Sequence, residues 1–246
     1  MGDERIYFDT ALGHFHDGEF DEAVHTCRWG LTVYPDAGRL WEVCGLSLWM
    51  RGDLGSALHA LEKASVLVPL APLAQFALAA AYAWADKPDL ARTVYRYLAQ
   101  LPVFPVPLLP RLAAGAGRVG EYAVALLVCE KIVELRPGYH PAWFGIAYYL
   151  RKLGRPIGEA IPMLEQALTH APDEEMYRLN LAACHAQTGD GEAAYRIAET
   201  VNVGAVRCRH WLRLLLPVFD AAGDLVQWAA CRTRLAELGD DCPRCL

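Results

Sequence analysis

Two cysteines near the end of the sequence have the spacing of a metal or redox site. Cys242 and Cys245 form a C-x-x-C pair in "DDCPRCL", a spacing used by zinc sites and thiol–disulfide centres. A structural zinc ion takes four ligands, and the sequence offers no second C-x-x-C and no spaced histidine pair. We therefore predict no metal site and no cofactor, and keep a thiol- or metal-dependent regulator that uses this pair as an alternative function.

The other patterns that resemble catalytic motifs lack the surroundings they need. "GAGRVG", residues 115–120, matches the G-x-G-x-x-G pattern of dinucleotide-binding loops. Such a loop must follow a strand, whereas "LLPRLAA" before it has the pattern of a helix. The sequence contains no G-x-S-x-G, H-E-x-x-H or P-loop pattern. We predict that the protein is not an enzyme.

Composition narrows the classes of partner. The 246 residues are 54% hydrophobic and carry a formal net charge of -6, so we expect a folded chain that does not bind nucleic acid. The start, "MGDERIYFDT", lacks the basic and apolar regions of a signal peptide, which predicts a reduced, cytoplasmic protein. Residues 64–85 are uncharged and long enough to span a membrane, but Pro69 and Pro72 interrupt them. We expect no membrane span.

Small residues, glycines and prolines recur along the whole sequence with a period of about 34 residues, which predicts a repeated pair of helices. The units begin at residues 4, 38, 72, 106, 140, 175 and 209. Two small residues per unit mark the point where two helices cross closely: Ala11, Gly45, Ala79, Ala113, Ala147 and Ala182, then Ala23, Ala57, Ala91, Ala125, Ala160 and Ala194. A glycine between them ends the first helix of most pairs: Gly18, Gly52, Gly120, Gly154, Gly189 and Gly223.

The segments "GEFDEAV", "GDLGSAL", "GEYAVAL" and "GDGEAAY" resemble the tetratricopeptide repeat (TPR) family. The resemblance extends over nearly the whole sequence. It implies an all-α, right-handed α-solenoid of about seven helix-turn-helix units, with a concave groove that holds another protein.

Departures from the repeat divide the chain into four predicted segments. Asp86 replaces the turn glycine of the third unit, and "LPVFPVPLLP" follows it. Prolines there must interrupt or delay the next helix. The predicted segments are units one to three (1–101), a Pro-rich bend (102–110), units four to six (111–208), and a degenerate seventh unit with the cysteine-containing tail (209–246).

The predicted binding surface is one stripe along the first helices. If the fourth, eighth and eleventh places of a unit face the second helix, the second, fifth, ninth and twelfth to thirteenth places share a neighbouring face. In the family this face lines the groove. The predicted groove residues are Arg5, Phe8, Leu12, Phe15, Arg39, Glu42, Leu46, Trp49, Phe76, Trp84, Phe144, Tyr148 and Arg151.

This stripe is rich in aromatic side chains, which predicts a covered surface. We expect a non-catalytic scaffold or adaptor that binds an extended or helical apolar segment of another protein, with Arg39, Glu42 and Arg151 fixing its register. A secretion or assembly chaperone for a hydrophobic client is an alternative. Tight supercoiling that buries the groove within the chain is the other explanation of the aromatic stripe.

Overall fold

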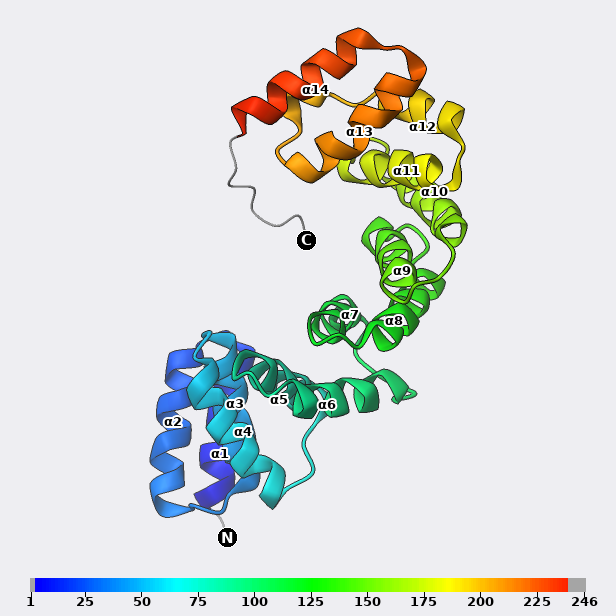
Figure 1. Ribbon diagram of the computed structural model, residues 1–246. Coiled ribbons are helices and arrows are strands. Elements are labelled where there is room, and N and C mark those ends of the chain that lie inside the picture. The colour runs from blue at the N-terminus through cyan, green and yellow to red at the C-terminus, as the bar shows by residue number, and fades with distance from the viewer. Residues whose placement is uncertain (1–2, 239–246) are drawn as a thin grey trace. The chain divides into compact units, whose positions relative to one another are not determined.

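The computed structural model describes residues 3–238, and their regular structure is entirely helical (Figure 1). These residues form fourteen α-helices and three short 3-10 helices, with no strand among them. The predicted all-α architecture of successive helix pairs is confirmed. The chain divides into two compact units that meet at Val128 and Cys129, inside α8 (Tyr122–Leu135).

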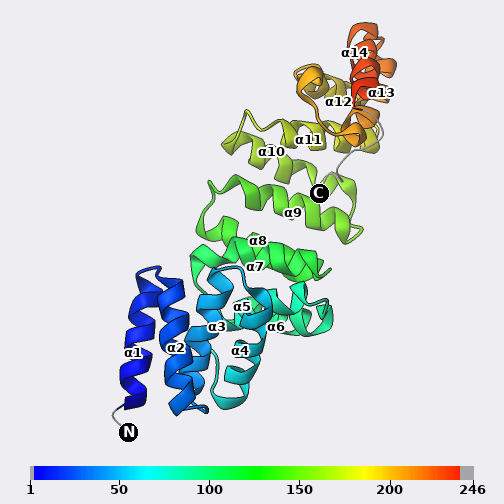
Figure 2. The ribbon, with the colours of Figure 1, turned by 90° about the vertical axis from the view of Figure 1, so that its left-hand side faces the viewer.

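The first unit contains the pairs nearest the N-terminus. Its helices before α8 are α1 (Asp3–His16), α2 (Phe20–Val33), α3 (Gly38–Met50), α4 (Leu54–Leu67), α5 (Pro72–Trp84), α6 (Pro88–Gln100), the 3-10 helix η1 (Val106–Leu108) and α7 (Leu109–Arg118). Successive helices pack against each other, as Figure 2 shows for α1 to α4. First helices also contact the next first helix, α1 with α3 and α3 with α5. The first helices α1, α3 and α5 therefore lie side by side and share one face.

The second unit repeats this arrangement. Its helices after α8 are α9 (His140–Lys152), η2 (Ile157–Glu159), α10 (Ile161–His170), α11 (Glu175–Thr188), α12 (Gly191–Ala198), η3 (Val203–Ala205), α13 (Arg209–Ala222) and α14 (Leu225–Glu237). Within this unit α11 contacts both α12 and α13. In both units a first helix thus packs against its own second helix and against the next first helix.

The small residues lie where the helices cross, as the repeat predicts. Ala11, Ala57 and Ala91 have no exposed surface. A Cβ atom added to Gly45 of α3 would lie 2.6 Å from Cγ of Leu61 on α4, which is closer than such atoms approach. The helices of a pair can approach this closely only because the side chain is absent.

The turn after each first helix requires a left-handed backbone. The six predicted turn glycines have φ between 69° and 85°. Asp86, which takes the glycine's place in the third unit, also has a positive φ of 55°. Asp tolerates this region better than most residues, but it retains a Cβ atom that crowds the backbone there. The turn geometry of the repeat is therefore kept at Asp86 with some strain.

Prolines end the second helices and delay one first helix. Pro35, Pro69, Pro137 and Pro172 each lie two residues after a second helix. In the Pro-rich segment the chain forms η1 before α7 begins at Leu109, so α7 has only 10 residues, against 13 in α5. The uncharged segment 64–85 is split between α4 and α5, and no helix of residues 3–238 is long and apolar enough to cross a membrane.

We predict that Asp86→Gly stabilises the fold. Glycine removes the Cβ crowding, and part of that gain is offset by the greater freedom of the unfolded chain, leaving about 0.5 kcal/mol. Urea unfolding followed by circular dichroism measures the difference. The control Asp86→Ala should be less stable than the wild type by about 1 kcal/mol. Alanine keeps the Cβ atom that crowds the backbone at positive φ, and it lacks the polar side chain by which Asp can hydrogen-bond locally. An Asp86→Gly variant that is less stable than the wild type would contradict the claim that the backbone is strained at Asp86.

Candidate functional site

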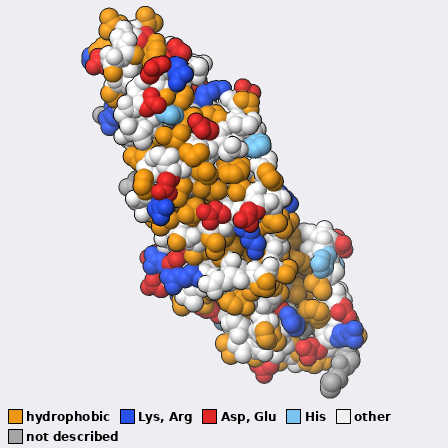
Figure 3. All heavy atoms as spheres, turned by 90° about the vertical axis from the view of Figure 1, so that its right-hand side faces the viewer, with side chains coloured by type: hydrophobic (Ala, Val, Ile, Leu, Met, Phe, Trp, Pro, Cys, Tyr) orange, Lys and Arg blue, Asp and Glu red, His pale blue; other side chains and the backbone are white. Residues whose placement is uncertain are grey.

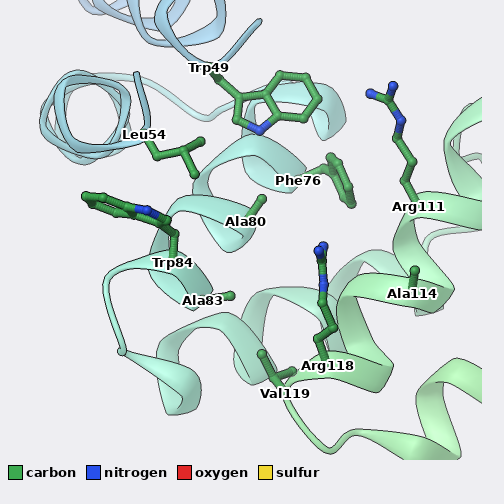
Figure 4. Close-up of a pocket in the computed structure, with 10 residues that line it drawn as sticks. All are labelled: Trp49, Leu54, Phe76, Ala80, Ala83, Trp84, Arg111, Ala114, Arg118 and Val119. Atoms are coloured by element: carbon green, nitrogen blue, oxygen red, sulfur yellow. The ribbon is translucent and has the colours of Figure 1, made fainter. Parts of the chain in front are cut away.

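The first unit has a cleft on the face that its first helices share. Its volume is about 610 Å³. The lining residues come mainly from α3, α5 and α7: Trp49, Leu54, Phe76, Ala80, Ala83, Trp84, Arg111, Ala114, Arg118 and Val119 (Figure 4). Clefts of this size, predominantly apolar with a few polar groups, are typical binding sites for ligands and side chains.

Large aromatic side chains form the walls of the cleft. The rings of Trp49 and Phe76 meet edge to face, with centroids 5.8 Å apart, and Phe76 also packs against Tyr95 at 6.1 Å. Trp84 leaves 61% of its surface exposed, and the end of its ring would lie 3.7 Å from a Cβ atom added to Gly55. Burial raises the pKa of Tyr95 to about 12, so this phenol stays neutral behind Phe76. Trp49 and Phe76 thus form a packed aromatic wall of the cleft, and Trp84 adds an exposed ring to it.

Small side chains give the cleft its room. Ala80 and Ala83 project from α5, and Ala114 projects from α7 opposite them. Larger residues at these places would fill the space between the two first helices. The cleft therefore depends on the alanines as much as on the aromatic walls.

The structure brings together three of the predicted groove residues. Trp49, Phe76 and Trp84 all line the cleft of the first unit. Phe8, Leu12 and Phe15 lie elsewhere, half-buried against the hydrophobic core of α1 to α4. Arg5 is exposed on α1 and lies 3.6 Å from Asp9.

Glu42 does not have the role that the sequence predicted for it. It is buried, its Oε2 accepts a hydrogen bond from Arg39 at 2.8 Å, and its Oε1 accepts one from the backbone N–H of Ala71 at 2.7 Å. Glu42 thus ties α3 to the start of α5 and is not available to fix the register of a partner. The expectation that it does so is wrong, because both carboxylate oxygens are used within the chain.

Leu46 and Phe76 are less exposed than the predicted surface stripe requires. Leu46 is 8% exposed in the core between α3 and α5, and Phe76 is 3% exposed. Packing of successive first helices covers these positions. Part of the aromatic stripe is therefore buried within the chain, and Trp84 and Trp49 supply the accessible part around Phe76.

In the second unit the predicted residues Phe144, Tyr148 and Arg151 all lie on α9, and each contacts a different neighbour. The ring of Phe144 stacks on Tyr177 with centroids 4.9 Å apart, and Lys152 lies over the ring of Tyr148. Arg151 donates a hydrogen bond of 3.3 Å to the buried amide of Asn180. These contacts occupy the side chains within the unit.

The second unit also has an apolar cleft, which the prediction did not include. It lies between α11, α12 and α13, has a volume of about 610 Å³, and includes Tyr195, Leu214 and Val218. The hydroxyl of Tyr195 donates to Asp224 at 3.1 Å. Unlike the cleft of the first unit, it has no cationic lining residue.

Sequence reasoning missed the residues that α7 contributes. The ninth and thirteenth places of the unit that begins at residue 106 are Ala114 and Arg118, so the positional rule used for the other units selects both. Arg111 occupies the sixth place, which the rule does not include, and it reaches the cleft because it lies three residues before Ala114 on the same helix face. The signal for Arg118 was present in the sequence, whereas Arg111 required the structure.

The buried thiols lie in the hydrophobic core. Cys27 of α2 and Cys44 of α3 are hydrogen-bonded to each other in the core, and this bond and burial raise the pKa of the Cys27 thiol. Among residues 3–238 no group of three or more His, Cys, Asp or Glu side chains is arranged to hold a metal ion. The C-x-x-C pair, Cys242 and Cys245, lies outside the described residues.

Exposed hydrophobic side chains occur on other faces as well. Figure 3 shows them over one face of the molecule, interspersed with charged groups. Val66, Val103 and Val226 are each about four-fifths exposed. Exposure alone therefore does not define a site, and the cleft of the first unit is distinguished by its concavity and its aromatic walls.

An array of helix pairs with an apolar cleft on its first helices defines a helical-repeat protein. Two family models described as tetratricopeptide repeat match the sequence, at residues 8–66 and 157–215. The chain belongs to the tetratricopeptide repeat family. Among curated proteins no sequence matches it.

Solved structures with low sequence identity share the fold. The C-terminal part of a TPR repeat-containing protein from Cytophaga hutchinsonii matches with a TM-score of 0.70 and 13% identity, over 94% of this chain and 95% of that one. YrrB, described as a TPR protein with an unusual peptide-binding site, matches with a TM-score of 0.60 and 17% identity, over 74% and 90%.

A larger assembly also contains a similar array. The structure of Naa15/Naa10 bound to HypK-THB matches with a TM-score of 0.61 and 17% identity. The match covers 96% of this chain and 37% of that chain. The chain thus spans little more than a third of the length of this relative.

We predict that Glu42→Ala lowers the stability of the fold. The substitution removes a charged acceptor from the backbone N–H of Ala71 and leaves a small cavity, which should cost about 2 kcal/mol in the free energy of unfolding. Urea unfolding measures the loss. Arg39→Ala, which removes only the half-exposed partner, should cost less than about 1 kcal/mol. Equal losses in the two variants would contradict the role assigned to the Ala71 contact.

Proposed function

We propose that this protein is a non-catalytic scaffold that binds an apolar segment of another protein in the cleft of its first unit. The observation that carries the proposal is the exposed ring of Trp84, held beside Trp49 and Phe76 over a floor of alanines. Interfaces take most of their binding free energy from a few such aromatic anchors in a concave site. The peptide-binding site named for YrrB, a structure of the same fold, agrees with this use of the repeat.

The shape of the cleft favours a short segment over a flat surface. The apolar wall and the open side at Trp84 leave space for one or two large side chains of the bound segment. Binding would bury the exposed ring and remove its apolar surface from water, which is favourable by about 25 cal/mol per Å². An extended or helical segment can present side chains in this way.

The secretion or assembly chaperone is the second version of the proposal and uses the same cleft. It differs in that the bound segment is released when the client assembles. A client that stays soluble only when co-expressed with this protein would favour the chaperone, and a complex that persists after assembly would favour the scaffold. The cytoplasmic location stays a prediction from the sequence.

We predict that Trp84→Ala abolishes capture of the partner. The tagged full-length protein, wild type or variant, is used to purify partners from its native host, with identification by mass spectrometry. Loss of a buried aromatic anchor should cost about 2 kcal/mol, or about thirtyfold in Kd. Trp29→Ala is the matched control, because Trp29 is also 61% exposed but lies on α2, away from the cleft. Partners that remain bound to Trp84→Ala would place the site elsewhere.

Filling the cleft is an independent test that removes no existing contact. Ala114 is exposed on α7 and faces α5 across the cleft, so Ala114→Trp should leave the helical fold intact and occupy the space of the bound segment. We predict at least about tenfold weaker binding of any partner lost from Trp84→Ala, measured by titration with the purified partner. Unchanged binding together with an unchanged unfolding curve would argue against occupancy of this cleft.

A further inference from the structure

The cleft of the first unit has charges of a single sign. Its two charged lining residues are Arg111 and Arg118, and none of the lining residues is acidic. Both arginines are exposed. The protein as a whole has a formal net charge of -6, so this local cluster of positive charge opposes the overall balance.

The neighbouring arginines of α6 provide a contrast. Arg92 pairs with Asp89 at 2.8 Å and donates to the carbonyl of Val119, while Arg96 makes two hydrogen bonds to Glu121. These side chains have a structural role that connects α6 to the residues around α7. Within residues 3–238 no ion pair joins Arg111 or Arg118 to a carboxylate.

The position of the two arginines places them at one binding surface. They are seven residues apart on α7, two helical turns along one face, with Ala114 between them. Figure 4 shows both side chains extending from α7 into the space beside Phe76. The guanidinium carbon of Arg111 lies 5.9 Å from the ring centre of Trp49, a cation–π contact that orients it at the rim.

Two like charges beside an apolar wall are stabilised when an anion is bound between them. Removal of water by an apolar segment lowers the local dielectric constant and strengthens an ion pair formed there. A guanidinium binds a carboxylate with two parallel hydrogen bonds, which adds direction to the attraction. The cleft therefore combines an apolar contact surface with two groups that recognise carboxylates.

We propose that the segment bound in this cleft is acidic, with Asp or Glu side chains next to an apolar or aromatic anchor. This inference rests on the proposed function and specifies the chemistry of the partner. The anchor lies against Trp84 and Phe76, and the carboxylates pair with Arg111 and Arg118.

Selection from a peptide library tests the composition of the bound segment. Random peptides of about ten residues, displayed on phage, are panned over the immobilised full-length protein. We expect the selected peptides to be enriched in Asp and Glu together with Phe, Trp, Leu or Ile. A selected set that is neutral or basic would overturn the acidic inference.

Charge reversal tests the role of the arginines. For the most enriched peptide, labelled with a fluorophore, fluorescence anisotropy should give at least about tenfold weaker binding to Arg111→Glu/Arg118→Glu than to the wild type. Lys63→Glu/Lys131→Glu makes the same change in net charge on other helices and should change Kd less than about twofold. A peptide with its acidic residues replaced by lysine should recover binding to the reversed cleft. Unchanged Kd in the reversed variant would overturn the inference.

Two further outcomes separate this inference from the proposed function. If Trp84→Ala loses the peptide but the charge reversal does not, the cleft binds apolar segments without selecting acidic ones. If the library yields no peptide, or if Trp84→Ala and Trp29→Ala bind alike, the proposed function itself is wrong and the acidic inference falls with it. Binding of a poly-dT oligonucleotide that is lost on charge reversal would show that the arginines serve a nucleic acid, against the proposal.

Discussion

The close crossing of the two helices in each pair is the constraint on which the rest of the structure depends. An alanine or glycine at the crossing lets the backbones approach, and Gly45 leaves no space for even one additional carbon against Leu61. The turn residues with positive φ then direct the second helix back along the first. Once both conditions are met in successive pairs, first helices pack against first helices, as α1, α3 and α5 do in the first unit and α11 and α13 do in the second.

The cleft is a consequence of that stacking. The cleft is lined mainly by α3, α5 and α7. Trp49 and Phe76 form one wall, and the small side chains of Ala80, Ala83 and Ala114 leave space beside it. Phe76 packs on Tyr95 behind it, so the wall is supported by the core. The same packing also buries part of the predicted stripe, since Leu46 and Glu42 are used to join neighbouring helices. A helix face in a repeat array thus serves both cohesion and binding, and individual positions are divided between the two.

Electrostatics distinguish the cleft from the rest of the first unit. Arg92 donates a hydrogen bond to the carbonyl of Val119 and Arg96 to the carboxylate of Glu121, which joins α6 to the turn after α7. Arg111 and Arg118 instead extend into the cleft beside aromatic rings. Charge in an apolar, concave place has a larger effect on binding than charge on an open surface, because less water screens it.

The sequence by itself determined the class of fold, the order of the helix pairs and the places of the turns. These follow from local rules: small residues where helices cross, left-handed φ after first helices, and proline after second helices. It also selected Trp49, Phe76 and Trp84 through their places in the repeat. Only the tertiary structure decided which of the stripe residues stay accessible, because burial of Glu42 and Leu46 depends on contacts with the next pair. It likewise decided that Arg111 joins the cleft, since this residue lies outside the predicted places but three residues before Ala114 on the same face of α7.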